Sequence, residues 1–295
     1  MIDDDALAAG APLSPAVRAA AAVLAEAGVP SARRDAELLL AHALRLDLKR
    51  LQHAMLLGSG LVPEEYSELV SLRAQRIPLQ HLTGVAWFRE LELAVGPGVF
   101  IPRPETEGVA GWAIDRCREL QAAGVTEPLV VDLGTGSGAI AASVAHEVPG
   151  TRVHAVELSP LAHAWADRNT RPHGVVLHLG DLRDALPELN GTVDVLVSNP
   201  PYIPSEAVPR EPEVADHDPE MALYGGGADG MELPLAAAAS AARLLHPGGF
   251  FIMEHAEVQA PWLLARLGRE SVWEDVRTHQ DLNGKDRATS ARRAG

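Results

Sequence analysis

The sequence has a single cysteine, Cys117, among its 295 residues, and it has no run close to the ~20 apolar residues that a membrane span needs. One cysteine cannot form an internal disulfide, which fits a reducing compartment. The helical pattern around Cys117 indicates a buried structural thiol rather than a nucleophile. The acidic residues 3–5 argue against a secretory or mitochondrial signal. We therefore expect a cytoplasmic protein that does not engage a membrane.

Aromatic and basic residues are also scarce. Aromatic side chains make up 4% of the chain, and its 25 lysines and arginines are outnumbered by 40 acidic residues, for a formal net charge of −15. A protein that holds a nucleic acid usually presents a basic face, whereas this sequence has no Lys/Arg cluster. No histidines, cysteines or acids have the spacing of metal ligands, so we expect no metal site. The balance favours a protein partner with a basic surface over a nucleic acid.

Residues 1–82 are predicted to form a small helical domain. Ser14-Pro15 is typical of a helix start, with the serine as the cap, and Gly28 is typical of a helix stop. Apolar residues at helical spacing predict three further helices, which begin near Ser31, Leu48 and Pro63. Nothing in this domain is typical of a catalytic centre, so we interpret it as a domain for substrate docking or packing.

Residues 83–104 are predicted to form a β-hairpin linker, since two short apolar segments are followed by the turn Gly96-Pro97-Gly98. From residue 105 to 295 the pattern alternates between buried strands and helices. This alternation predicts an α/β fold with a doubly wound, Rossmann-like parallel sheet. In such sheets the chemistry lies at the carboxyl ends of the strands.

A glycine-rich loop, Gly134-Thr135-Gly136-Ser137-Gly138, follows the first predicted strand of the sheet. Glycines allow a tight turn and a close approach of a ligand to the backbone. The spacing is shorter than that of the dinucleotide fingerprint, and the loop lacks the Gly-Lys-Ser/Thr of a phosphate-binding P-loop. The loop therefore indicates a nucleotide-like ligand of another kind.

Three acids at successive strand ends surround this loop. Asp132 precedes the loop and suits an amino group, Glu157 suits ribose hydroxyls, and Asp181 can accept from an adenine amine. A cofactor with a cationic amino-acid end and an adenosine end matches all three. S-adenosylmethionine has both ends, so we expect it to be the cofactor.

A fourth strand end carries Asn199-Pro200-Pro201-Tyr202. Neither proline can donate to a sheet, so the strand must stop and leave Asn199 at its carboxyl end. An asparagine oxygen beside a stiff backbone can accept hydrogen bonds from a planar NH2 group. The motif predicts chemistry on an amide nitrogen or on the exocyclic amine of a base.

With these motifs the sequence resembles the bacterial release-factor glutamine methyltransferases, the protein-(glutamine-N5) methyltransferase family. The resemblance covers nearly the whole chain. Its matching segments are Arg76–Gly84, Phe100–Glu107, Asp132–Gly138, Asn199–Tyr202, Ala222–Gly226 and Asp281–Arg287. The Pro-Arg-Pro-Glu-Thr-Glu of residues 102–107 is the most specific of them, since Asn-Pro-Pro-Tyr alone also occurs in adenine-N6 methyltransferases.

The resemblance implies S-adenosyl-L-methionine as methyl donor, S-adenosyl-L-homocysteine as product, and the glutamine of the Gly-Gly-Gln loop of class 1 release factors as acceptor. It implies cofactor contacts at Asp132, Gly134, Thr135, Gly136, Gly138, Glu157, Asp181, Leu182 and Asn199. It places substrate contacts at Arg103, Glu105, Asn199, Pro200, Pro201 and Tyr202. Two positions depart from the family: Leu182, where some members have an aromatic residue, and His217-Asp218, where relatives usually have an aromatic residue and a glutamate. We expect a monomer.

For catalysis we expect the Asn199 oxygen and the Pro200 carbonyl each to accept one N–H of the glutamine NH2, with Tyr202 packed against the amide. No general base is evident. Three other functions stay open: methylation of a glutamine in a ribosomal protein, N-methylation of a nucleic-acid base, and non-catalytic binding of S-adenosylmethionine. The acidic balance and the low aromatic content count against the nucleic-acid substrate.

Overall fold

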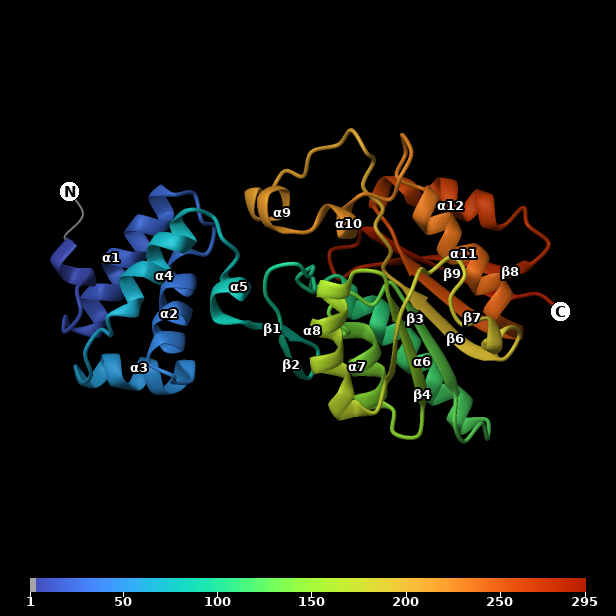
Figure 1. Cartoon of the computed structure of the whole chain (residues 1–295), viewed down its shortest axis with the longest axis horizontal. Coiled ribbons are helices and arrows are strands. Elements are labelled where there is room, and N and C mark those ends of the chain that lie inside the picture. The colour runs from blue at the N-terminus through green and yellow to red at the C-terminus, as the bar shows by residue number, and fades with distance from the viewer. Residues whose placement is uncertain (1–3) are drawn as a thin grey trace. The chain divides into compact units, whose positions relative to one another are not determined.

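The computed structural model describes residues 4–295, so part of the acidic start of the chain lies outside the described residues. The chain divides into two compact units. Unit 1 extends to Val85 and also includes Pro209–His217, and unit 2 consists of Ala86–Val208 and Asp218–Gly295 (Figure 1). Within residues 4–295 no helix is both long enough and apolar enough to cross a membrane.

Unit 1 is helical, as predicted. Its elements are η1 (Asp4–Leu7), α1 (Leu13–Glu26), α2 (Ala32–Ala43), α3 (Leu48–Leu57), α4 (Glu65–Ala74), α5 (Leu79–Thr83) and α9 (Pro212–His217). Apolar residues at helical spacing, such as Leu39 and Leu40, are fully buried in one core. The predicted cap at Ser14 is wrong: α1 begins at Leu13, and the Ser14 hydroxyl donates instead to the Met55 carbonyl at 3.3 Å.

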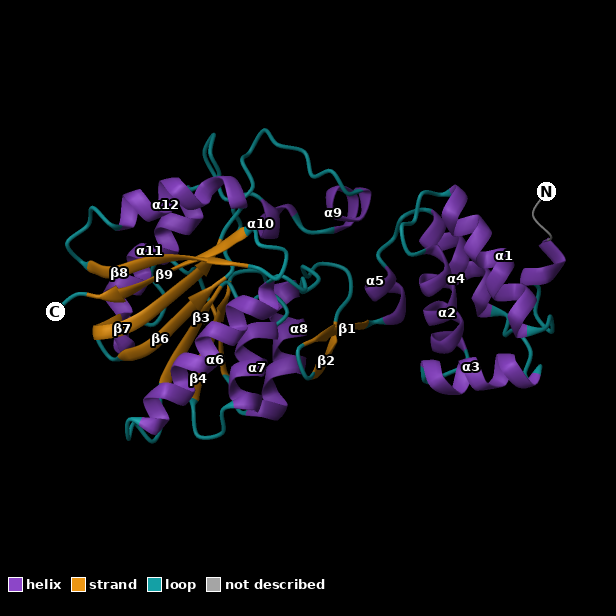
Figure 2. Ribbon diagram, turned by 180° about the vertical axis from the view of Figure 1, so that it is seen from behind, coloured by secondary structure: helices purple, strands orange, loops and turns teal. Residues whose placement is uncertain are grey.

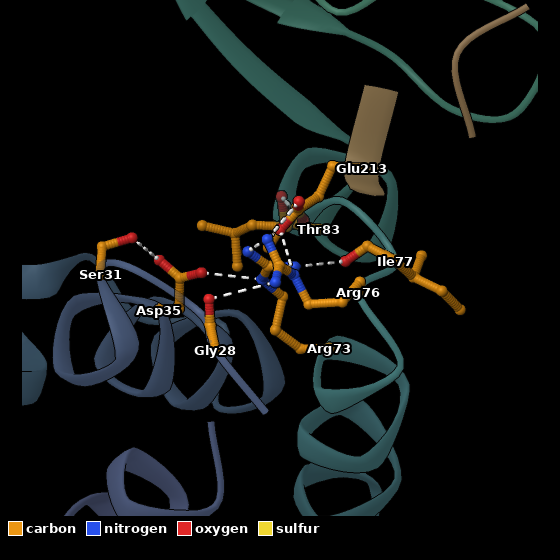
Figure 3. Close-up of polar contacts among 9 residues, drawn as sticks. Gly28, Ser31, Asp35, Arg73, Arg76, Ile77, Thr83 and Glu213 are labelled. Carbon is orange, nitrogen blue, oxygen red and sulfur yellow. Dashed lines mark hydrogen bonds and ion pairs between the residues drawn. The ribbon is translucent and has the colours of Figure 1, made fainter. Parts of the chain in front are cut away.

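Helix α9 packs within unit 1, although the residues on both sides of it in the sequence belong to unit 2. Its Glu213 carboxyl accepts hydrogen bonds from Arg73 at 2.8 Å and from Arg76 at 2.8 and 2.6 Å. Buried Arg73 also donates to Asp35 at 2.8 Å (Figure 3). The sequence assigned residues 209–217 to the range 105–295; these ion pairs explain why they group with the N-terminal helices instead.

We expect the substitution Glu213→Gln to destabilise unit 1 at neutral pH but not in acid. Partial burial raises the pKa of the Glu213 carboxyl, but hydrogen bonds from Arg76 and Arg73 outweigh it and lower the pKa from 4.5 to about 2. The contribution of the ionised group is therefore complete above pH 4.5 and is lost as the pH falls toward about 2. Near neutral pH the variant should lose about 1.5–3 kcal/mol of unfolding free energy.

Urea unfolding of both proteins at several pH values, followed by far-ultraviolet circular dichroism, measures this difference. The control is Glu68→Gln on α4, which removes the same charge from an exposed position. The control should unfold like the wild type at each pH. A difference between Glu213→Gln and wild type that stays constant down to pH 2 would contradict the role of the ionised carboxyl.

Unit 2 contains a seven-stranded sheet in the order β5-β4-β3-β6-β7-β9-β8. Its strands are β3 (Leu129–Leu133), β4 (Arg152–Glu157), β5 (Val176–Leu179), β6 (Val193–Ser198), β7 (Leu245–Glu254), β8 (Trp273–Gln280) and β9 (Asp286–Arg293). The first five in this order are parallel, which confirms the predicted Rossmann-like sheet. Strand β9 is antiparallel to both neighbours. The connection between β8 and β9 is short and permits only an antiparallel pair of these two strands, because a parallel pair needs a long crossover.

Helices cover both faces of this sheet, as Figure 2 shows. They are α6 (Thr106–Ala122), α7 (Ala139–Glu147), α8 (Pro160–Thr170), α11 (Glu232–Leu244) and α12 (Ala260–Leu267). One apolar cluster joins α6 and α7 to Val130 of β3, and another joins α11 and α12 to the next residue, Val131. Successive strand residues point to opposite faces, and both faces are buried, so the central strands are apolar throughout.

A two-stranded hairpin, β1 (Val85–Phe88) and β2 (Leu91–Ala94), forms in the predicted linker. Asn169 of α8 holds it, since the side-chain amide accepts from the Ala94 N–H at 2.8 Å and donates to the Ala94 carbonyl at 2.9 Å. The same amide donates to the Ser137 carbonyl in the glycine-rich loop at 2.8 Å. From Ala86 onward the hairpin therefore belongs structurally to unit 2.

The order of the strands fixes where a ligand can bind. From β3 the chain continues to β4 on one side, whereas β6 lies on the other side of β3. Ligands of open α/β sheets bind at such a reversal, outside the carboxyl ends of the strands. The glycine-rich loop after β3 and the Asn-Pro-Pro-Tyr after β6 meet this condition together.

Candidate active site

The glycine-rich loop turns through three residues with positive φ: Gly134, Gly136 and Gly138, at 71°, 59° and 83°. A Cβ at Gly134 or Gly136 would meet no atom of residues 4–295 within 4 Å, so the backbone angle requires glycine there and the adjacent space is open. At Gly138 a Cβ would lie 2.5 Å from the Thr170 methyl group. The loop thus has an open side at the first two glycines and a packed side at the third.

Asp132 lies at 0% exposure near the carboxyl end of β3. Its Oδ2 accepts from the Thr135 hydroxyl at 2.6 Å and from the Ala141 N–H at 3.2 Å. Its Oδ1 is buried and has no hydrogen-bond partner in the described part of the chain. Burial raises the pKa of this carboxyl to about 7. The site thus holds an acceptor without a partner, which a cationic ligand group would suit.

The acids at the ends of β4 and β5 already have partners. The buried Glu157 carboxyl accepts from the Gly136 and Ser159 N–H groups, both at 2.8 Å, and burial raises its pKa. Asp181 accepts from the Arg183 backbone and guanidinium, both at 2.9 Å. Leu182 is buried in the apolar cluster beneath α11. An ionised carboxylate has about four acceptor positions, so both acids retain capacity for a ligand.

Asn199 follows β6 directly and is half-buried. Its Nδ2 donates to the Thr106 hydroxyl at the start of α6, at 3.2 Å. Neither Asn199 Oδ1 nor the Pro200 carbonyl accepts a hydrogen bond from another residue in the range 4–295. Two acceptors on consecutive residues are therefore available at the carboxyl end of the central strand.

Tyr202 and Glu254 form a polar pair beside this motif. The Tyr202 hydroxyl donates to Glu254 Oε1 at 3.4 Å, and burial raises the pKa of the tyrosine. Glu254 is the last residue of β7 and is 2% exposed. Its Oε2 is buried and has no hydrogen-bond partner among residues 4–295. Burial raises the pKa of Glu254 to about 7.

The Pro-Arg-Pro-Glu-Thr-Glu segment reaches the site through Thr106, which contacts Asn199, and through Glu105. Arg103 pairs with Asp218 at 2.7 Å and lies over the Phe100 ring at 4.9 Å. Asp218, one of the departures from the family, is therefore an ion-pair partner of Arg103 in this chain. Half-buried Glu105 precedes α6 and adds negative charge near Glu254 and Tyr202.

The backbone after Asn-Pro-Pro-Tyr is held by the Ala222–Gly226 segment. The Ile203 N–H donates to the Leu223 carbonyl at 2.9 Å, and the Gly225 N–H donates to the Ile203 carbonyl at 3.0 Å. Gln259 adds a hydrogen bond from Nε2 to the Tyr202 carbonyl at 2.9 Å. The motif is thus pinned on its carboxyl side by a backbone pairing and a buried side chain.

Sequence reasoning did not assign Thr106, Glu254 or Gln259 to the site. Glu254 could have been found, because it ends a predicted strand in the same way as Asp132 and Glu157 do. Thr106 is part of a family segment, but its contact with Asn199 spans 93 positions and leaves no local pattern. The structure places most of the predicted residues around the carboxyl ends of β3, β4 and β6, with Asp181 and Leu182 after β5. The predicted Arg103 instead contacts Asp218 and Phe100.

Two family models match the chain. The PrmC N-terminal domain matches residues 15–84, and the Methyltransferase small domain matches residues 117–211. A solved structure, the catalytic domain of hMettl16 in complex with the MAT2A 3'UTR hairpin 6, has a TM-score of 0.53 at 15% identity and covers 77% of this chain and 82% of its own. At that identity it shows the fold alone. The fold and the family matches make this protein a methyltransferase.

Curated relatives define the family more closely. A release factor glutamine methyltransferase of Streptomyces coelicolor is 49% identical over 281 residues and covers 92% of this chain and 94% of its own. The chain belongs to the release factor glutamine methyltransferase family. A 4-amino-L-phenylalanine/4-methylamino-L-phenylalanine methyltransferase of Streptomyces pristinaespiralis is 41% identical over 269 residues and covers 90% of this chain and 91% of its own.

Proposed function

We propose that this enzyme transfers a methyl group from S-adenosylmethionine to the side-chain amide nitrogen of the glutamine in the Gly-Gly-Gln loop of class 1 release factors. The observation that carries the proposal is the pair of available acceptors, Asn199 Oδ1 and the Pro200 carbonyl, at the carboxyl end of β6. A primary amide has two N–H groups in one plane. Two fixed acceptors match that geometry.

The acceptors answer the chemical difficulty of this substrate. An amide nitrogen is a weak nucleophile because its lone pair is delocalised into the carbonyl. Asn199 and Pro200 hold the two N–H groups, so that the free face of the nitrogen points at the methyl group. Such positioning lowers the activation free energy by roughly 7–11 kcal/mol in well-oriented systems. The same oxygens stabilise positive charge as it develops on the nitrogen. Tyr202 packs against the amide. As the N–CH3 bond forms the S–CH3 bond breaks, S-adenosylhomocysteine is the leaving group, and the methylated nitrogen then gives one proton to water.

The residues around the glycine-rich loop suit S-adenosylmethionine. Asp132 Oδ1 would accept from the amino group, and the open side at Gly134 and Gly136 leaves room for the ligand. Glu157 would hold the ribose hydroxyls, with the adenine near Asp181 and Leu182. Thr135 and Gly138 would keep the loop in shape. When bound, S-adenosylmethionine supplies a methyl group activated by a positive sulfonium.

If Asp132 holds the cationic end of the cofactor, cofactor affinity should rise with pH. Burial raises the pKa of Asp132 from 3.8 to about 7, so below pH 7 the carboxyl of the free enzyme is mostly protonated. A cationic ligand favours the ionised form. We expect the affinity for S-adenosylmethionine to increase by up to about tenfold per pH unit below that pKa and to level off above it. Isothermal titration calorimetry across this range measures the slope.

The substitution Asp132→Asn should lower the affinity and remove the slope, because the amide does not titrate. Glu157→Gln is the matched control, since it removes a neighbouring carboxyl that would contact only neutral hydroxyls. It should weaken binding but retain the rise with pH. Equal slopes in wild type and Asp132→Asn would exclude Asp132 as the group that holds the amino end.

The second candidate substrate is an aromatic amine. The Streptomyces pristinaespiralis relative, 41% identical to this chain, is named for 4-amino-L-phenylalanine. An aryl NH2 group also presents two N–H groups to a pair of acceptors, so the Asn199 site alone does not separate it from a glutamine. The higher identity to the release factor glutamine methyltransferase of Streptomyces coelicolor, 49% against 41%, supports the protein substrate, and we assign unit 1 to docking the release factor.

The decisive experiment offers the enzyme labelled S-adenosylmethionine with each acceptor in turn. We expect label in a class 1 release factor, mapped by mass spectrometry to the glutamine of Gly-Gly-Gln, and none in a factor with that glutamine replaced by alanine. Labelling of 4-amino-L-phenylalanine alone would establish the second candidate. Label found only in a ribosomal protein or in nucleic acid, or in none of these, would overturn the proposal.

A further inference from the structure

Asn199 and Glu254 occupy equivalent positions on neighbouring strands. Strands β6 and β7 are parallel with Ser198 opposite Met253, so Asn199 and Glu254 are the next residues at the same edge of the sheet. Thr106, the first residue of α6, lies beside both: its hydroxyl accepts from Asn199 Nδ2 at 3.2 Å, and the same hydroxyl lowers the pKa of the Glu254 carboxyl. All three belong to unit 2.

We propose that Thr106 and Glu254 are positioning residues that fix the orientation of the Asn199 amide, so that its oxygen and not its NH2 group faces the acceptor nitrogen. The inference rests on the proposed function, in which Asn199 Oδ1 accepts from the substrate NH2. Neither residue needs to contact the substrate.

The need for such a device follows from the symmetry of an amide. The two ends of the Asn199 side chain have nearly the same shape, but one accepts and the other donates. With the amide turned over, two NH2 groups would face each other, and the substrate nitrogen would lose its acceptor. Packing alone does not distinguish the two orientations, so a hydrogen-bond partner has to do so.

Thr106 distinguishes them because its own proton has a fixed direction. A hydroxyl can donate once and accept as well, whereas an ionised carboxylate can only accept. In this arrangement the Thr106 proton goes to ionised Glu254, whose buried Oε2 has no hydrogen-bond partner among residues 4–295, and the Thr106 oxygen lone pairs remain for Asn199. Those lone pairs select the NH2 end of the amide, as the 3.2 Å contact shows.

The surroundings of Glu254 suit this role. Burial raises its pKa to about 7, whereas the Thr106 hydroxyl and the positive charge of Arg287 lower it, so Glu254 is mostly ionised, and able only to accept, above that pH. Arg287 is itself held by Asp281 at 3.1 Å. The Tyr202 hydroxyl donates to the same carboxyl at 3.4 Å, so one buried acid orients side chains on both sides of the double proline.

The test compares Thr106→Val, which keeps the shape and removes the hydroxyl, with Thr106→Ser, which keeps the hydroxyl. With a release factor as substrate, we expect Thr106→Val to lower kcat by about 10–100-fold and Thr106→Ser to retain it within about threefold. The dissociation constant of S-adenosylmethionine should change by less than about threefold in both, which separates orientation from loss of the site. Glu254→Gln should lower kcat in the same way as Thr106→Val.

A second arm places Thr106→Val in an Asn199→Ala background. If Thr106 acts through Asn199, the second substitution should have no further effect, whereas independent effects would multiply. Multiplying effects, a wild-type kcat in Thr106→Val, or equal losses in the valine and serine variants would overturn the inference. If Thr106→Val does not fold, Glu254→Gln is judged by the same cycle. Failure of the wild-type enzyme to methylate any release factor would instead count against the proposed function.

Discussion

Replacing Asn199 with alanine is expected to lower kcat for methylation of the release-factor glutamine by about 10²–10³-fold or more. Losses of this size follow removal of one fixed hydrogen-bonding group that stabilises a developing charge in a buried site. Here the deleted oxygen also aims the nitrogen, so the orientation of the substrate is lost together with the electrostatic stabilisation. The Pro200 carbonyl remains as a single acceptor and leaves the amide free to rotate.

Single-turnover methylation and calorimetric titration with S-adenosylmethionine separate the two functions of the site. Most of the proposed cofactor contacts lie around Asp132 and Glu157, so the dissociation constant should change by no more than a few-fold in Asn199→Ala. Asn283→Ala is the control, because it truncates an asparagine at an exposed turn between β8 and β9. Near-wild-type methylation by Asn199→Ala would show that the central assignment is wrong.

The substitution Gly225→Ala should disrupt the site without touching any side chain in it. A Cβ at Gly225 would lie 2.0 Å from the Gly230 carbonyl oxygen, 2.6 Å from the Pro201 carbonyl oxygen and 2.8 Å from the Tyr202 Cα. All three atoms are backbone, so no side chain can rotate away, and the Pro-Pro-Tyr segment must move. Overpacking of this kind costs about 1–3 kcal/mol of stability, occasionally more. A displacement of ~1 Å can lower turnover by ~10²-fold.

Thermal unfolding and kcat, measured on the same preparation, test this expectation. The matched control is Gly108→Ala in α6, where a Cβ would meet only Trp112, at an ordinary 3.8 Å. It should leave activity unchanged and raise stability by about 0.5–1 kcal/mol, since alanine is favoured over glycine in a helix. Wild-type activity and stability in Gly225→Ala would mean that the segment tolerates the shift.

The residues at the carboxyl edge of the sheet could be predicted from the sequence, because a polar residue at the end of an apolar strand lies at the same edge for every parallel strand. Apolar runs ending in Asp132, Glu157 and Asn199 predict one shared edge, and the structure places these residues there. The same rule applied to the run ending in Glu254 would have found the fourth polar group. Thr106 is the first residue of α6. The sequence around a helix start does not indicate which strand end that helix start contacts, so the position of Thr106 in the site could not be predicted.

Contacts between distant charged residues could not be predicted. Arg73 and Glu213 are separated by 140 positions, and each alone has the pattern of an exposed side chain on a helix. Helix α9 has only six residues, and the ion pairs of its Glu213 with Arg73 and Arg76 hold it in place. Ser14 shows the converse, since a local rule predicted a cap and a tertiary hydrogen bond to Met55 prevailed.

Helix α9 also sets an order of events during translation. The ribosome must synthesise residues 86–208 after it has synthesised the N-terminal helices and before Glu213 exists. At ~5–20 residues per second this interval is on the order of ten seconds. Until then Asp35 is the one acid among residues 4–208 that pairs with Arg73, and Arg76 has none of its Glu213 contacts. A nascent chain halted before residue 213 should therefore carry an incomplete N-terminal unit, and a gene fragment ending at residue 85 would keep that defect permanently.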